Sequence, residues 1–228
     1  MSWLINSSIG RKFVMALSGL TLVLFLLFHM SMNLVSIISI EAYEQICALL
    51  GVNWYALVGT AALAALFVIH ICYAIVLTLR NRKARGNDQY ASSNLSDVPW
   101  SSKNMLVLGI AILVFLLIHL YDFWFKMMFA ELFHLEEIVV YPENVGNHML
   151  AVFSNPIKVA LYLIGVIAIW FHLSYGIWSM CQSSGLNGKT WMPRLKCIAN
   201  IVSTIVCIGF AIVPIYFFAK SILCTSCM

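Results

Sequence analysis

Residues 13–37 have the sequence FVMALSGLTLVLFLLFHMSMNLVSI, an apolar stretch with one histidine, His29, deep inside it. A helix needs roughly 20 apolar residues to cross the hydrocarbon core of a membrane, so this stretch is long enough to span one. It is too long for the apolar part of a cleaved signal peptide, and no small-residue cleavage site follows it. Four further stretches have the same character, at about 54–79, 104–129, 157–180 and 198–220.

The composition agrees with a membrane protein. Hydrophobic residues make up 62% of the 228 residues and charged residues only 10%, whereas soluble domains carry about 25% charged residues. The apolar character extends over the whole chain, which excludes a soluble domain held by a single anchor. We therefore expect an all-α integral membrane bundle of five transmembrane helices, with residues 1–228 forming one domain.

The positive charges are distributed unevenly between the two ends of the predicted helices. Ten lie on the side of the N-terminus: Arg11, Lys12, Arg80, Arg82, Lys83, Arg85, Lys103, Lys189, Arg194 and Lys196. Three lie on the other side: Lys126, Lys158 and Lys220. Cytoplasmic loops carry the excess of lysine and arginine, so we expect a cytoplasmic N-terminus and, after five crossings, a C-terminus outside.

The acidic residues show the opposite bias. Seven are expected on the outer side, and only Asp88 and Asp97 on the inner side. The net charge of +4 follows from this asymmetry between the two sides of a membrane. It does not indicate binding to nucleic acid.

Each of the first four stretches contains one histidine: His29, His70, His119 and His172. An ionisable side chain in hydrocarbon is costly, so one histidine per helix calls for a shared reason. With a rise of 1.5 Å per residue, His29 and His119 lie about 25 Å from the cytoplasmic helix ends, and His70 and His172 about 14–15 Å from them. The histidines therefore form two pairs at two depths.

Two facing pairs of imidazoles are the arrangement that holds two haems by paired axial histidines. We expect the four histidine-bearing helices to enclose two stacked haems. The sequence has no C-x-x-C-H motif, so such haems are held by coordination and packing alone. A zinc or copper site would want three or four ligands at one level. The plain alternative is that each histidine only forms a hydrogen bond to a neighbouring helix. The fifth stretch has Pro214 and no histidine, which indicates a packing role.

Several short motifs accompany these histidines in order along the chain. They are Ser7-Ser8-Ile9-Gly10-Arg11-Lys12 with Met15-Ala16 and Ser18-Gly19-Leu20, His29 with Asn33, His70 with Leu77-Thr78, Asn81-Arg82 and Ala84-Arg85, His119 with Asp122-Phe123-Trp124 and Lys126, and His172 with Gly176, Ser179, Gln182 and Gly185-Leu186. In this ordered set the chain resembles the cytochrome b membrane anchor of succinate:quinone oxidoreductases, the bacterial succinate dehydrogenases and fumarate reductases, in the five-helix, two-haem form.

The resemblance implies that His70 and His172 ligate the haem nearer the cytoplasm, and His29 and His119 the haem nearer the outside. It also implies a flavoprotein subunit and an iron–sulfur subunit docked on the cytoplasmic face of a bacterial cytoplasmic membrane. The chemistry of succinate and fumarate belongs to that flavoprotein, and this chain transfers electrons between the iron–sulfur subunit and menaquinone. In one respect the chain departs from the family: some members carry a proton-conducting glutamate two residues before the fourth histidine, where this chain has Trp170.

A quinone near the outer surface needs proton-exchanging groups beside it. The candidates near the outer ends of the first and third helices are Asn33, Glu41, Glu44, Asp122 and Lys126. Each has a plainer interpretation: Glu41 and Glu44 as solvated loop charges, and Asp122 with Lys126 as an i,i+4 ion pair at the interface. His134 and His148 lie in the expected outer loop and are predicted to be surface histidines.

Two other functions stay open at this stage. The chain could be a di-haem cytochrome b of another quinone-linked dehydrogenase or hydrogenase. It could also be a haem-free, proton-coupled transporter that uses the intramembrane histidines as relays. A transporter of that kind predicts no visible absorbance and an acidic residue near mid-membrane, and none of the nine acidic residues is expected there.

Overall fold

The structure is a computed structural model, and it describes residues 7–85, 100–183, 185 and 188–226. Asp88, Asp97 and Leu186, which contributed to the sequence analysis, lie outside the described residues. Throughout the described ranges the regular structure is helical, and no strand occurs in them.

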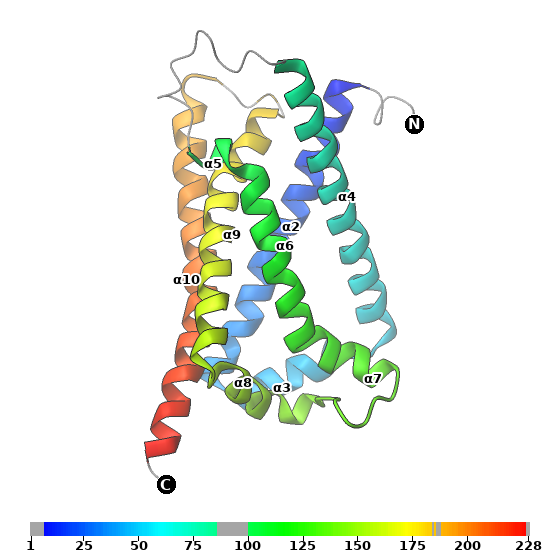
Figure 1. Ribbon diagram of the computed structural model, residues 1–228, viewed down its shortest axis with the longest axis vertical. Coiled ribbons are helices and arrows are strands. Elements are labelled where there is room, and N and C mark those ends of the chain that lie inside the picture. The colour runs from blue at the N-terminus through cyan, green and yellow to red at the C-terminus, as the bar shows by residue number, and fades with distance from the viewer. Residues whose placement is uncertain (1–6, 86–99, 184, 186–187, 227–228) are drawn as a thin grey trace.

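Five long helices form the body of the molecule (Figure 1). They are α2 (Ser8–Ile38), α4 (Trp54–Arg85), α6 (Met105–His119), α9 (Pro156–Ser183) and α10 (Trp191–Ser226). After His119, α6 continues without a break into the π-helical segment η2 (Leu120–Phe129) and the short α7 (Ala130–Leu132). All five are long and apolar enough to cross a membrane. The prediction of an all-α, multi-pass membrane bundle is confirmed at this level.

The first and last helices extend well beyond the predicted apolar windows. α2 begins at Ser8 rather than near residue 13, because Ser7 caps it: the Ser7 hydroxyl accepts the Gly10 N–H at 2.8 Å. α10 begins at Trp191 rather than near residue 198. An apolar window marks where hydrocarbon can lie, whereas a helix continues for as long as its backbone hydrogen bonds and caps allow.

Short helices close one end of the bundle. α3 (Ile40–Leu49) follows α2, and η3 (Pro142–Asn144) and α8 (Val145–Phe153) precede α9. The expected outer loop is therefore partly helical. Val145, Met149 and Phe153 lie on one buried face of α8 at i,i+4 spacing, which packs the helix against the end of the bundle. The short α5 (Trp100–Lys103) precedes α6 at the opposite end.

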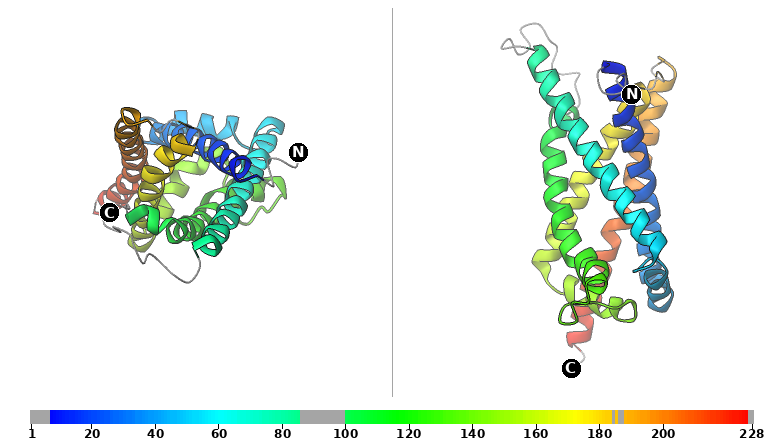
Figure 2. Two further views of the ribbon diagram at one scale, coloured as in Figure 1. Left: turned by 90° about the horizontal axis from the view of Figure 1, so that it is seen from above. Right: turned by 90° about the vertical axis from the view of Figure 1, so that its right-hand side faces the viewer.

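The long helices pack unequally. α9 and α10 lie side by side along their length, α2 packs against both of them, and α6 packs against α9. The indole N–H of Trp170 on α9 donates to the Thr204 hydroxyl on α10 at 3.0 Å. α4 lies at the edge of the bundle, packs mainly along α2 and has little contact with α6 (Figure 2). The histidine-free α10 thus packs against two of the four histidine-bearing helices.

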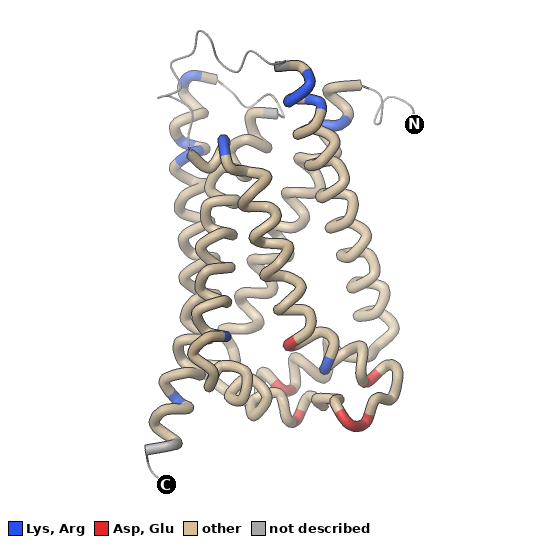
Figure 3. The backbone as a smooth tube through the Cα atoms, in the orientation of Figure 1, with Lys and Arg blue, Asp and Glu red and all other residues tan. Residues whose placement is uncertain are grey.

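The charges separate to the two ends of the bundle (Figure 3). Most lysine and arginine side chains lie at the end that carries the N-terminus, and the acidic side chains gather at the end closed by α3 and α8. The long tan stretches between these ends carry almost no charge. This separation is the one that the sequence indicated, and we call the second end the acidic end below.

Candidate functional site

The rings of His29 and His119 face each other in the half of the bundle nearer the acidic end. His29 lies on α2 and His119 is the last residue of α6. Their ring centroids are 5.8 Å apart and the ring planes are nearly perpendicular, at 84°. Phe25 stacks on His29, and Phe115 stacks on His119, with centroid distances of 5.4 and 6.1 Å. This outer pair therefore lies in an aromatic environment.

The rings of His70 and His172 form a second, inner pair. His70 lies on α4 and His172 on α9, and their centroids are 6.4 Å apart at an angle of 64°. The Ser18 hydroxyl of α2 lies 3.0 Å from Nδ1 of His70. Nδ1 of His172 is buried, and no hydrogen bond reaches it from any described residue. A buried ring nitrogen without a partner is unusual in a folded protein.

The two pairs are the ones that the depth argument predicts. Imidazole nitrogens that bind one metal ion from opposite sides, with bonds of about 2.0–2.1 Å, place their ring centroids about 6 Å apart. Both observed separations, 5.8 and 6.4 Å, lie close to this value. Within the described ranges, no group of three or more histidine, cysteine or acidic side chains could hold a metal ion. The donor set is two imidazoles per level, which suits a metal whose other ligands come from a macrocycle.

Asn33 joins the outer pair to α3. Its amide Nδ2 donates to the carbonyl oxygen of His29 at 2.7 Å, and its Oδ1 accepts the Tyr43 hydroxyl at 3.1 Å. Tyr43 is buried, and burial raises the pKa of its hydroxyl. With these partners, Asn33 holds the end of α2 in place.

Glu41 and Glu44 lie apart from the other candidates. Glu41 is exposed and accepts the Ser39 hydroxyl at 2.8 Å. A backbone hydrogen bond and this hydroxyl lower the pKa of its carboxyl. Glu44 lines a small cavity of about 180 Å³ together with Gly146 and Lys220. The structure therefore does not bring the five candidate residues into one site.

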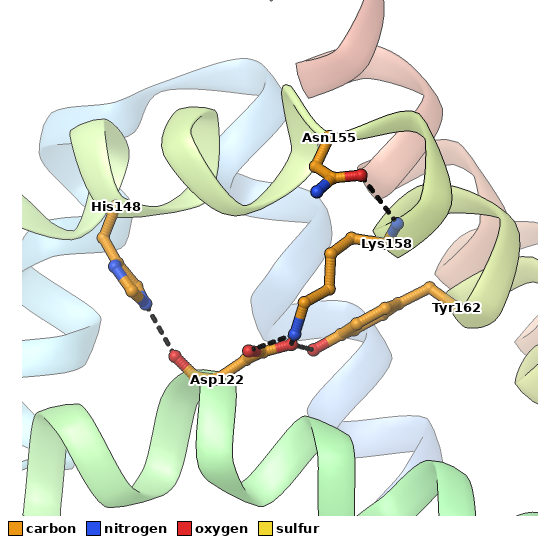
Figure 4. A network of polar contacts seen from close by, with 5 residues as sticks. All are labelled: Asp122, His148, Asn155, Lys158 and Tyr162. Atoms are coloured by element: carbon orange, nitrogen blue, oxygen red, sulfur yellow. Dashed lines mark hydrogen bonds and ion pairs between the residues drawn. The ribbon is translucent and has the colours of Figure 1, made fainter.

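Asp122 lies in a polar network between α6 and α9 (Figure 4). Its carboxylate oxygens accept Nζ of Lys158 at 2.7 and 2.8 Å, and one of them also accepts the Tyr162 hydroxyl at 3.1 Å. The i,i+4 ion pair between Asp122 and Lys126 is wrong. These residues lie in the π-helical segment η2, where i→i+5 bonding turns position i+4 away from position i. The ammonium of Lys126 instead lies 5.4 Å from the centroid of the Tyr121 ring.

His148 on α8 belongs to the same network. Its Nε2 lies 2.6 Å from the carbonyl oxygen of Asp122. A carbonyl oxygen only accepts, so Nε2 carries the proton and donates, which leaves the lone pair on Nδ1. His148 is half-buried, and this burial lowers the pKa of its imidazole, against the opposing effect of the bond to Asp122. The prediction of a surface histidine is wrong, because the apolar face of α8 draws the helix onto the bundle.

A cavity of about 330 Å³ opens beside this network. Its lining residues are Tyr121, Asp122, Lys126, His148, Ala151, Val152, Asn155 and Lys158. We call it the outer pocket. Of the predicted quinone-site residues, Asp122 and Lys126 line it. The sequence analysis missed His148 and Lys158; the i,i+4 spacing of Val145, Met149 and Phe153 is the signal that could have placed His148 on a helix against the bundle.

Tyr162 connects the outer pocket to the outer histidine pair. Its hydroxyl bonds to Asp122, and its ring centroid lies 6.1 Å from that of His119. The pocket and the imidazole pair are therefore separated by a single aromatic side chain. This arrangement suits a small polar-headed molecule that exchanges electrons with a centre held by His29 and His119.

No family model, curated protein sequence or solved structure matches the chain.

Proposed function

We propose that this chain is the cytochrome b membrane anchor of a succinate dehydrogenase or fumarate reductase complex, a subunit that carries electrons between an iron–sulfur subunit and menaquinone. The observation that supports the proposal most directly is the pair of facing imidazoles at each of two depths. Four helices that each contribute one histidine, matched in twos, are hard to explain by hydrogen bonding alone. Nδ1 of His172 is buried without any such bond among the described residues.

The four imidazoles would hold two haems b without covalent attachment. His70 and His172 would ligate the inner one, and His29 and His119 the outer one. A bis-histidine haem has no free coordination position, so it supplies electron transfer rather than oxygen binding. The surrounding phenylalanine rings of the outer pair exclude water from these ligands.

In this proposal the outer pocket binds the quinone head group. The Lys126 ammonium can donate a hydrogen bond to a quinone oxygen, and His148 can exchange the proton that quinone chemistry requires. Because burial lowers the pKa of His148, its imidazole is neutral at pH 7 and its Nδ1 can accept a proton from a quinol. Asp122 is held by Lys158 and Tyr162, which makes it an anchor of the pocket rather than the exchanging group.

The separation of charge supports the proposed orientation. The basic end, with the N-terminus, would face the cytoplasm of a bacterial cell and contact the iron–sulfur subunit, to which the flavoprotein subunit is bound. The acidic end, with the outer pocket and the C-terminus, would face outside. Exposed basic side chains at the end of α4, such as Arg80, Arg82 and Lys83, are available for an acidic partner surface or anionic lipid.

The experiment that tests the proposal is a haem assay. We expect the purified complex to show two haems b per chain by pyridine haemochrome, with a reduced-minus-oxidised spectrum typical of bis-histidine ligation. Absence of haem would overturn the proposal and favour the transporter alternative. Reduction of the haems by succinate in the complex separates this assignment from a cytochrome b of another dehydrogenase or a hydrogenase, which succinate would leave oxidised.

The quinone pocket has its own test. We expect Lys126→Met and His148→Gln to raise the KM for a soluble menaquinone analogue while both haems are retained. Glu41→Gln is the matched control on the same end of the bundle, because Glu41 lies outside the outer pocket. An unchanged KM in both pocket variants would move the quinone site elsewhere, without affecting the haem assignment.

A further inference from the structure

The inner histidine pair is held unequally by its surroundings. Ser18 lies one helix away from His70, on α2, and only 2% of it is exposed. Its hydroxyl oxygen is 3.0 Å from Nδ1 of His70. In the described part of the chain, no side chain or backbone group bonds to Nδ1 of His172. Ser18 is therefore the polar group that orients the inner pair, and it acts on one of the two rings.

The second bond of Ser18 decides the direction of the first. The hydroxyl donates to the carbonyl oxygen of Met15, one helical turn earlier, at 3.1 Å. A hydroxyl has one proton to donate and lone pairs with which to accept. With its proton directed to Met15, the Ser18 oxygen accepts from His70, so the His70 proton lies on Nδ1. The lone pair of the imidazole is then on Nε2.

We infer that Ser18 is a positioning residue that holds His70 as the tautomer with a proton on Nδ1 and presents its Nε2 lone pair toward His172. This inference rests on the proposed function, since Nε2 would be the atom that binds the inner haem iron. No covalent bond forms or breaks in this role, and no proton moves on His70. The role of Ser18 is to fix which nitrogen is free and which way the ring faces.

A hydrogen bond from the distal nitrogen also changes the ligand's electronic character. Donation from Nδ1–H to a neighbouring oxygen raises the basicity of the nitrogen that binds the metal. A more basic ligand favours the ferric form over the ferrous form, so the bond to Ser18 lowers the reduction potential of the inner centre. The outer pair has no contact with Ser18 and should not respond to its removal.

The test compares Ser18→Ala with the buried control Ser36→Ala by redox titration of the purified complex. Ser36 lies on the same helix, is also buried and also donates to a carbonyl one turn earlier, that of Asn33 at 2.7 Å. We expect Ser18→Ala to raise the inner potential by about 59 mV, which is a tenfold change for a one-electron couple. That is the lower end of the 10–100-fold effect of losing such a partner. The outer potential should stay unchanged, and Ser36→Ala should shift neither.

Two conservative variants keep the inference testable if Ser18→Ala does not fold. Ser18→Cys retains the volume but accepts hydrogen bonds weakly, and Ser18→Thr retains the hydroxyl. We expect the inner potential of the threonine variant to match the wild type and that of the cysteine variant to lie above it. Selective loss of the inner haem in Ser18→Ala or Ser18→Cys, with the outer haem retained, would support the same role.

The failure of this inference differs from the failure of the proposed function. Two haems per chain with unchanged potentials and unchanged low-temperature spectra in both Ser18→Ala and Ser18→Cys would overturn the role of Ser18 alone. A wild-type protein without haem would overturn the proposed function, whatever the Ser18 variants do.

Discussion

The ammonium nitrogen of Lys158 lies 2.7 and 2.8 Å from the two carboxylate oxygens of Asp122, so that α9 is tied to α6 one turn beyond His119. The carboxylate side is almost fully enclosed, with 3% of the Asp122 side chain exposed against 32% for Lys158. Removal of one partner of such a pair leaves a buried charge without compensation. The pair is therefore a structural anchor whose two members should be strongly coupled.

We expect Lys158→Met to lower the free energy of unfolding by about 2–3 kcal/mol, less than the 3–5 kcal/mol of a fully buried pair, because Lys158 is partly exposed. The double variant Lys158→Met/Asp122→Asn should recover part of this loss, since the uncompensated charge is gone. Thermal unfolding in detergent measures both. Lys126→Met, which removes a lysine from the same segment without breaking the pair, is the control. Additive effects of Lys158→Met and Asp122→Asn would contradict the coupling.

The histidine pairs predict which variants share a phenotype. His29→Ala and His119→Ala should each remove the same haem and leave the other, and His70→Ala and His172→Ala should remove the second one. The reason is that each iron needs both of its axial ligands, and the partner rings are 5.8 and 6.4 Å apart in the structure. Haem content and low-temperature spectra of the four variants check this. Loss of different haems in His29→Ala and His119→Ala would refute the pairing.

His148 predicts a pH dependence of stability. Burial lowers the pKa of its imidazole in the folded protein below the value of about 6.5 that it has when unfolded. Below that value the unfolded chain binds more protons than the folded one, so stability is full above about pH 6.5 and falls as the pH falls toward the lowered pKa. One such group contributes a slope of at most about 1.4 kcal/mol per pH unit.

We therefore expect His148→Gln to be less sensitive to acid than the wild type between pH 6.5 and 5 in thermal unfolding experiments. His134→Gln is the matched control, because His134 is an exposed histidine in the same connection. An identical pH slope in wild type and His148→Gln would show that the folded state does not lower the pKa of His148.

Gly165 predicts a packing defect of known direction. A Cβ atom at this position would overlap the Phe115 ring, with Cδ1 of that ring 2.9 Å away. The ring cannot withdraw freely, since it packs against both His119 and Tyr162. We expect Gly165→Ala to lower the free energy of unfolding by about 1–3 kcal/mol, the usual cost of overpacking. Gly59→Ala is the control: a Cβ there meets nothing within 4 Å. Equal stability of the two variants would contradict the close approach of α6 and α9.

Much of the architecture follows from local properties of the chain. Five apolar stretches predict five helices, because only a helix satisfies its own backbone hydrogen bonds in hydrocarbon. The depth of each histidine follows from a constant rise per residue, which is why the sequence could pair His29 with His119 and His70 with His172. The separation of basic and acidic residues between the two ends follows from the positions of the loops alone.

The partners of individual polar groups depended on tertiary structure. Asp122 pairs with Lys158 of α9 rather than with Lys126, because a π-helical segment changes the angular register of η2 and a second helix lies beside it. His148 came to the outer pocket because α8 folds back against the bundle. Rise along a helix is the same in every helix, so sequence alone determined depth. The direction in which a side chain points around that helix depends on packing, and only the assembled bundle decided it.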